Sequence, residues 1–140
     1  MGIVIIKYNA GNVFSVKCAL HRIGVDAVIT DDKEIIMNAD KVIFPGVGEA
    51  STAMAYLRLH RMDEMIKSLT QPVLGICIGM QLLCKHSQEG NTDCLGIFDT
   101  MVMRFDNSNS PLNKIPHMGW NTIEVMPNEL VDSSFDNKFV

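Results

Sequence analysis

The chain lacks a cysteine framework for zinc or for disulfide bonds. Its four cysteines lie at positions 18, 77, 84 and 94, with no Cys-x-x-Cys pair and no spacing typical of a zinc site. Unpaired thiols of this kind are typical of a reducing compartment. The sequence therefore predicts a cytoplasmic protein with no metal site and no cofactor.

Positive charge and long hydrophobic runs are also scarce. Twelve Lys and Arg against sixteen Asp and Glu give a net charge of −4, which argues against binding to the phosphates of nucleic acids. The apolar run Ile3-Val4-Ile5-Ile6 is too short for a signal peptide or a membrane span. A hydrophobic fraction of 47% and a length of 140 residues fit one globular domain over residues 1–140, without internal repeats.

Short apolar runs alternate with helical patterns along the first half of the chain. We expect strands at residues 3–6, 25–30 and 42–44 and just before Cys77, with helices opening at Asn12, at Asp32 and near Ala50, the last broken near His60. This alternation predicts an α/β fold, a three-layer, mostly parallel sheet flanked by helices. Residues 97–105 and 120–126 are further strand candidates, and residues 106–111 read as a polar loop.

The most informative segment surrounds Cys77. The run Val73-Leu74-Gly75-Ile76-Cys77-Ile78-Gly79-Met80-Gln81 reads as a buried strand, a sharp turn and the start of a helix. That is the nucleophile-elbow pattern, with cysteine in the place of serine. Gly75 and Gly79 flank the cysteine where such a turn leaves no room for a Cβ atom. The helix N-terminus favours the thiolate, so we interpret Cys77 as a nucleophile and not as a buried structural thiol.

A cysteine nucleophile that attacks a carbonyl group passes through an oxyanion, which needs backbone N–H donors. The N–H of Ile78, directly after the nucleophile, is one candidate. A second donor could come from Gly46-Val47-Gly48, because this turn ends the strand at residues 42–44. The carboxyl ends of parallel strands meet at one edge of a sheet, so both turns are expected there.

The sequence offers no clear general base among its histidines at positions 21, 60, 86 and 117. If the helix after Cys77 continues through Cys84 to His86, this imidazole lies about 13 Å along the helix axis, beyond hydrogen-bond reach. His117 lies in a loop, and no histidine comes with an evident residue to orient it. Glu49 and Ser51 are expected to cap a helix.

Four motifs together resemble the class I, triad-type glutamine amidotransferases. They are Lys7-Tyr8-Asn9-Ala10-Gly11-Asn12, Phe44-Pro45-Gly46-Val47-Gly48, Gly75-Ile76-Cys77-Ile78-Gly79-Met80-Gln81 and Pro116-His117-Met118-Gly119-Trp120-Asn121. Within that class, the fourth motif resembles the glutaminase subunits of imidazole glycerol phosphate synthase, from histidine biosynthesis. Lys7 and Asn9 depart from the usual first motif, which has aspartate and glycine there.

The resemblance implies that Cys77 hydrolyses glutamine to glutamate and ammonia. It implies oxyanion-hole amides at Val47 and Ile78, and contacts to glutamine from Gly46, Gly48 and Gln81. It also implies a heterodimer with a (βα)₈-barrel cyclase subunit, which uses the ammonia to make imidazole glycerol phosphate. His117, Met118, Trp120 and Asn121 would lie toward that partner.

The family's catalytic histidine and glutamate lie in a His-Pro-Glu stretch near the C-terminus, which these 140 residues do not contain. We therefore expect an amidotransferase domain that is truncated at its C-terminus and inactive alone. Two alternatives remain open from the sequence: an inert amidotransferase-like fragment that acts as a binding module, and another cysteine hydrolase on the same scaffold.

Overall fold

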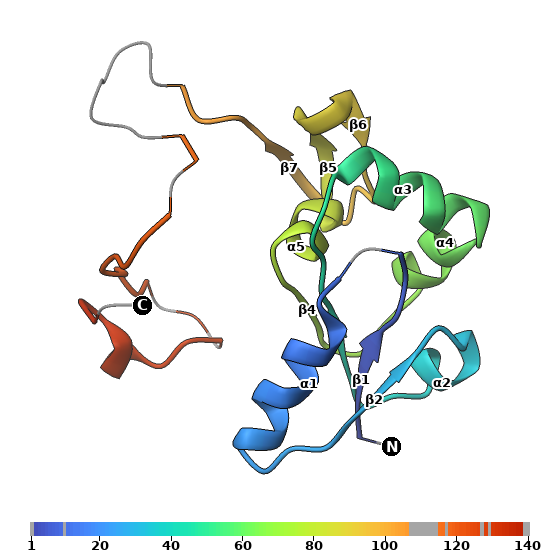
Figure 1. Ribbon diagram of the computed structural model, residues 1–140, viewed down its shortest axis with the longest axis horizontal. Helices are drawn as coiled ribbons and strands as arrows, with labels where there is room; N and C mark the ends of the chain where they lie inside the picture. The colour runs from blue at the N-terminus through green and yellow to red at the C-terminus, as the bar shows by residue number, and fades with distance from the viewer. Residues whose placement is uncertain are drawn as a thin grey trace. The chain divides into compact units, whose positions relative to one another are not determined.

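The computed structural model describes residues 2–9, 11–106, 115–116, 118–126, 128 and 130–138 (Figure 1). The chain divides into two compact units, residues 1–104 and 105–140, which are described separately. The single domain over residues 1–140 stays a prediction.

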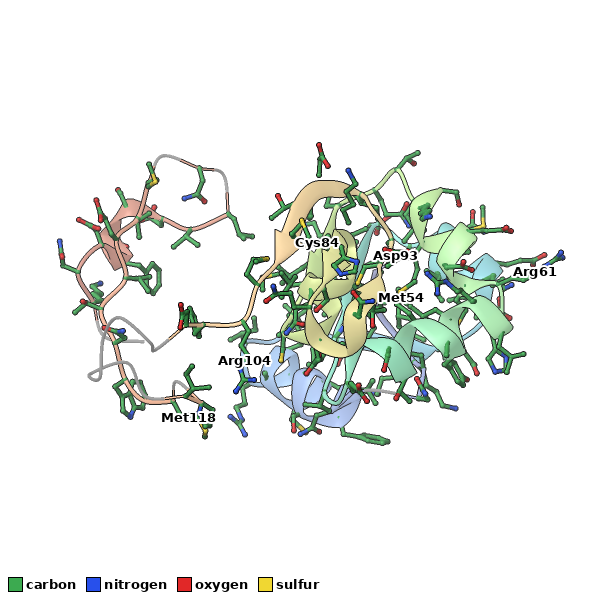
Figure 2. All side chains as sticks on the ribbon, turned by 90° about the horizontal axis from the view of Figure 1, so that it is seen from above. Met54, Arg61, Cys84, Asp93, Arg104 and Met118 are labelled. Atoms are coloured by element: carbon green, nitrogen blue, oxygen red, sulfur yellow. The ribbon has the colours of Figure 1, made fainter. Side chains whose placement is uncertain are left out.

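The elements of the first unit follow the expected alternation up to α5. They are β1 (Ile3–Ile6), α1 (Val13–Arg22), β2 (Ala27–Thr30), α2 (Lys33–Met37), β3 (Lys41–Phe44), α3 (Ala50–Leu59), α4 (Met62–Lys67), β4 (Val73–Gly75), α5 (Ile78–Leu83), β5 (Cys84–Ser87), the 3₁₀ turn η1 (Glu89–Asn91), β6 (Thr92–Asp93) and β7 (Phe98–Val102). The predicted break near His60 is confirmed: Arg61 has φ of 53° between α3 and α4, and its side chain points away from the unit (Figure 2).

Strands β1 to β4 form a parallel sheet in the order β2-β1-β3-β4. Alternate residues of the central strands point to opposite faces. Val4 and Ile6 join the core under α2, α3, α4 and α5, whereas Ile5 joins a smaller core under α1. Helices thus cover both faces of the sheet, with α1 opposite α3 and α4 in Figure 1, and the predicted three-layer α/β fold is confirmed.

Two of the expected helix starts have a side-chain cap. The Asp32 carboxylate accepts hydrogen bonds from the backbone N–H groups of Glu34 (2.9 Å) and Ile35 (3.2 Å) at the start of α2. Asn12 accepts from the N–H of Ser15 at the start of α1 (3.4 Å). Local side-chain chemistry therefore accounts for where these helices begin.

The expected continuation of the helix after Cys77 to His86 is wrong. Helix α5 ends at Leu83, and Cys84 begins β5, which pairs parallel to β7 and antiparallel to β6. The carbonyl oxygens of Cys84 and Lys85 accept hydrogen bonds from the N–H groups of Gly96 (2.8 Å) and Cys94 (3.0 Å). These strand contacts replace the helical hydrogen bonds and create a small second sheet that the local pattern did not predict.

In the second unit, the expected strand at residues 120–126 is also wrong. Among its described residues only Thr122 forms an isolated bridge, and the one helical element is the 3₁₀ turn η2 (Ser133–Phe135). The N–H of Ile123 donates to the carbonyl of Lys138, and the carbonyl of Ile123 accepts from the N–H of Asn137. Two residues on, the N–H of Val125 donates to the Asp136 carboxylate (2.8 Å) and not to a backbone carbonyl, so the strand pairing does not continue. Across the described parts of both units, no helix has the length and apolar character needed to cross a bilayer.

Candidate active site

Cys77 lies in a strained turn between β4 and α5. Its backbone has φ of 55° and ψ of −117°, a conformation that L-residues rarely adopt, and the residue is exposed. The strand ends at Gly75 and the helix begins at Ile78, so the turn is as short as the elbow pattern requires. The predicted strand–turn–helix geometry around Cys77 is therefore present, but the expected burial of the strand is wrong, because Leu74 is 40% exposed.

The two glycines that flank the turn are needed because backbone approaches them closely. A Cβ atom on Gly79 would lie 1.8 Å from the carbonyl oxygen of Phe44, and one on Gly75 would lie 2.8 Å from the Cα atom of Met80. Both distances are shorter than any ordinary Cβ contact. The start of α5 therefore packs directly on the end of β3, which positions Cys77 beside the turn that follows β3.

That turn, residues 45–48, lies against the first residues of α5. A Cβ atom on Gly46 would lie 2.8 Å from both the N atom of Gly79 and the Cβ atom of Ile78. The Phe44 carbonyl accepts a hydrogen bond from the N–H of Ile76 (3.0 Å), which ties the two turns together. Val47 is 53% exposed and Gly48 has φ of +116°. The structure thus brings together the two segments expected to supply oxyanion donors.

An open cavity of about 700 Å³ lies one helical turn beyond Cys77, and Gln81 forms part of its wall. Glu89, from η1, and Arg104, after β7, also line this cavity.

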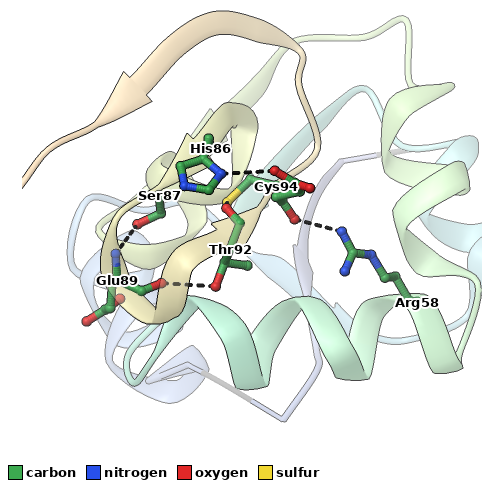
Figure 3. Close-up of polar contacts among 7 residues, drawn as sticks. Arg58, His86, Ser87, Glu89, Thr92 and Cys94 are labelled. Carbon is green, nitrogen blue, oxygen red and sulfur yellow. Dashed lines mark hydrogen bonds and ion pairs between the residues drawn. The ribbon is translucent and has the colours of Figure 1, made fainter.

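Sequence reasoning missed Glu89 and assigned the cap of α3 to Glu49 and Ser51. Glu49 makes no side-chain cap bond; instead a Glu89 carboxylate oxygen accepts from the N–H of Ala50 (3.1 Å). The Glu89 turn is itself held by Ser87, whose hydroxyl accepts from the N–H of Glu89 (3.2 Å), and by the Thr92 hydroxyl, which donates to the Glu89 carbonyl (2.9 Å; Figure 3). No local pattern signals this contact, because Glu89 and Ala50 are 39 residues apart.

The sequence predicted no role for Tyr8, which contacts the turn at residues 45–48. Its side chain is 8% exposed, its ring packs on Phe44 with centroids 5.3 Å apart, and its hydroxyl donates a hydrogen bond to the Pro45 carbonyl (2.6 Å). Burial raises the pKa of Tyr8, and the negative charge of the Cys77 thiolate raises it further. The phenol therefore remains protonated, as a donor, near Cys77.

The sequence predicted no orienting partner for any histidine, and for His86 this prediction is wrong. The His86 ring lies 2.9 Å from a carboxylate oxygen of Asp93, whose backbone carbonyl accepts a hydrogen bond from Arg58 (2.7 Å; Figure 3). The imidazole is thus turned toward β6. His21 lies 3.7 Å from Asp26 on the surface, and His60 packs on the ring of Tyr56. His117 lies outside the described residues.

The other residues predicted to face a partner lie in the second unit. Met118 is 86% exposed and Trp120 is 82% exposed, and Asn121 is exposed as well. Large exposed apolar side chains are the kind that anchor protein interfaces. Their role at an interface stays a prediction.

No group of three or more His, Cys, Asp or Glu side chains with a geometry for metal binding occurs within the described ranges.

Comparison with known proteins identifies the family of this chain. Residues 2–108 match the family described as the CobB/CobQ-like glutamine amidotransferase domain. The imidazole glycerol phosphate synthase subunit HisH of Bacteroides fragilis (strain YCH46) is 58% identical over all 140 residues, which cover 71% of that protein. The HisH subunit of Bacteroides thetaiotaomicron is 56% identical with the same coverage. The HisH subunit of Idiomarina loihiensis is 48% identical over 96% of this chain and 67% of that protein. The chain therefore belongs to the glutamine amidotransferase family and, within it, to the HisH subunits of imidazole glycerol phosphate synthase.

Proposed function

We propose that this chain hydrolyses glutamine with Cys77 as nucleophile and supplies the ammonia to a synthase partner in histidine biosynthesis. The observation that carries the proposal is the exposed Cys77 at a positive-φ turn, with the segment 45–48 packed against the first turn of the following helix. This arrangement suits attack on a carbonyl carbon, and the four unpaired thiols suit a cytoplasmic protein.

The Cys77 sulfur attacks the side-chain amide carbon of glutamine and forms a C–S bond. The thiol proton passes to the amide nitrogen, the carbon–nitrogen bond breaks and ammonia leaves. Water then hydrolyses the thioester to glutamate and restores the Cys77 thiol. Ile78 is the first residue of α5, and its N–H has no partner within the helix, so it is one donor to the oxyanion. We assign the second donor to Val47, in the exposed loop packed against that helix.

The charges of the cavity beside Gln81 support an amino-acid substrate. An α-amino acid carries an ammonium and a carboxylate group, and the acidic Glu89 and the basic Arg104 are among the residues that line the cavity. We propose that Gln81 and the glycines at positions 46 and 48 contact the bound glutamine, where a glycine allows the backbone to approach a ligand. No cofactor takes part in this hydrolysis.

We further propose that the partner is a (βα)₈-barrel cyclase subunit, with which the chain forms a heterodimer. His117, Met118, Trp120 and Asn121 would lie toward it. The exposure of Met118 and Trp120 supports this assignment, because tryptophan and methionine are enriched at interfaces.

The test is glutamate release from glutamine by the protein as its native gene produces it, with and without the purified cyclase subunit. We expect Cys77→Ala to abolish the release. Cys18→Ala is the matched control, because Cys18 is also exposed but lies on α1. Activity that survives in Cys77→Ala would refute the nucleophile. Cyclase binding without glutamate release by the wild-type protein would identify a binding module instead.

A further inference from the structure

The hydroxyl of Tyr8 contacts the loop at residues 45–48, which in the proposed function supplies the second hydrogen-bond donor to the oxyanion. It donates a 2.6 Å hydrogen bond to the carbonyl of Pro45, although the two residues are 37 positions apart. Tyr8 follows β1, which pairs with β3, and Pro45 follows β3. The contact therefore joins the ends of two neighbouring strands at the edge of the sheet where Cys77 also lies.

This hydrogen bond fixes the direction of one peptide plane. In a trans peptide the carbonyl and the N–H point in opposite directions, so an anchored Pro45 carbonyl also fixes the N–H of Gly46. The next peptide plane carries the N–H of Val47. Gly46 itself is confined, because a Cβ atom added there would lie 2.6 Å from the Tyr8 hydroxyl oxygen and 2.8 Å from the N atom of Gly79. The segment is thus held between the phenol and the first turn of α5.

The position of the phenol is itself well determined. Its ring is buried in the main core and packs on Phe44, whose carbonyl accepts from the N–H of Ile76. The two consecutive carbonyls of residues 44 and 45 therefore have separate donors, one from the Cys77 turn and one from Tyr8. A rigid aromatic ring with a buried hydroxyl gives the loop a fixed reference point.

We propose that Tyr8 is a positioning residue for the glutaminase reaction: its hydrogen bond to Pro45 sets the peptide plane that precedes the Val47 amide and so aligns that amide with the developing oxyanion. The inference rests on the proposed function of Cys77 and Val47. Tyr8 does not touch substrate; it acts through the loop.

The test compares two alkylating probes on the same cysteine in the intact protein. The chloromethyl ketone analogue of glutamine (L-2-amino-4-oxo-5-chloropentanoate) has a carbonyl that accepts hydrogen bonds from the oxyanion donors. Chloroacetamide has no glutamine backbone to seat its carbonyl there. With either probe the sulfur forms a C–S bond, chloride leaves and the thiol proton is released. Labelling is followed at each cysteine by peptide mass spectrometry, with Cys18 as the internal reference.

We expect Tyr8→Phe, which keeps the ring and removes only the hydroxyl, to slow labelling of Cys77 by the chloroketone about tenfold, because a misplaced donor loses much of its effect. Labelling of Cys77 by chloroacetamide should stay within about twofold, as expected if the thiol itself is unchanged. Tyr56→Phe is the matched control, because it removes a hydroxyl from the other tyrosine, on α3, and should change neither rate.

Three results would overturn the inference, and each has a distinct meaning. Unchanged chloroketone labelling in Tyr8→Phe would show that the hydroxyl does not align the loop. A parallel fall with both probes would show that the hydroxyl supports the fold and not the donor. If the wild-type protein shows no preference for the chloroketone at Cys77 over Cys18, the proposed function fails before Tyr8 is at issue.

Discussion

Replacing Gly79 with alanine tests how tightly the first turn of α5 packs on the end of β3. The added Cβ atom would lie 1.8 Å from the carbonyl oxygen of Phe44, whereas real Cβ atoms essentially never come closer than 3.0 Å. The helix must therefore move away from β3 by about 1.2 Å, the difference between these two distances (3.0 − 1.8). No side-chain rotation relieves this contact, because the obstacle is backbone.

The displacement has two energetic consequences. The same Phe44 carbonyl accepts a hydrogen bond from the N–H of Ile76 (3.0 Å), and loss of this hydrogen bond costs about 1 kcal/mol. Ile78 and Leu82, both buried on α5, lose their packing, and overpacking of this kind costs about 2 kcal/mol. We therefore expect Gly79→Ala to lower the free energy of unfolding by about 3 kcal/mol.

Equilibrium unfolding in urea, followed by far-UV circular dichroism, measures this change. The five α-helices of the described residues lie in the first unit, whereas the single tryptophan lies in the second, so tryptophan fluorescence would report on the wrong unit. If the unfolding free energy falls by about 2 kcal/mol per molar urea, the midpoint of the urea transition should fall by about 1.5 M. Gly2→Ala is the control, since its Cβ atom would meet nothing closer than the Asp26 carbonyl at 4.0 Å. A Gly79→Ala protein within about 1 kcal/mol of that control would refute the reasoning.

Three further predictions concern single residues. The raised pKa of Tyr8 keeps its proton on the folded protein while the unfolded chain loses it above about pH 10, so the unfolding free energy should fall between pH 10 and 11 by about 1 kcal/mol; equal slopes in wild-type and Tyr8→Phe protein would contradict this. Asp32→Ala removes the acceptor for two N–H groups of α2 and should cost about 1 kcal/mol in urea unfolding, and a matching loss in Asp31→Ala would argue against the cap. Trp120→Ala should weaken cyclase binding by more than about 1 kcal/mol in calorimetry, and unchanged affinity would remove it from the interface.

The elements that were predicted correctly depend on local chemistry. The apolar run at residues 3–6 forms β1, Asp32 caps α2, and the glycines at positions 75 and 79 flank a turn with the expected geometry. Each signal lies within a few residues of its effect. The parallel arrangement of β1 to β4 follows as well, because alternating strands and helices favour parallel strands joined by helical crossovers.

The failures involve partners that are distant in sequence or depend on pairing. Residues 84–87 continue a helical pattern, yet they form β5 because β6 and β7 offer hydrogen bonds on both sides. The same pairing moves His86 off the helix and sets it beside Asp93. Residues 120–126 have strand-like composition, but the Asp136 carboxylate occupies the N–H that a ladder would use. In each case hydrogen bonds to residues elsewhere in the chain outweighed the local secondary-structure propensity.

The sequence by itself determined the α/β class, the elbow at Cys77 and the resemblance to amidotransferases, because glycine spacing and hydrophobic period act within one segment. Only the tertiary structure decided that Tyr8 anchors Pro45 and that Glu89 caps α3 beside the cavity of Gln81. Those contacts join residues 37 and 39 positions apart. Their partners meet only when the sheet and the η1 turn have packed, so no local pattern encodes them.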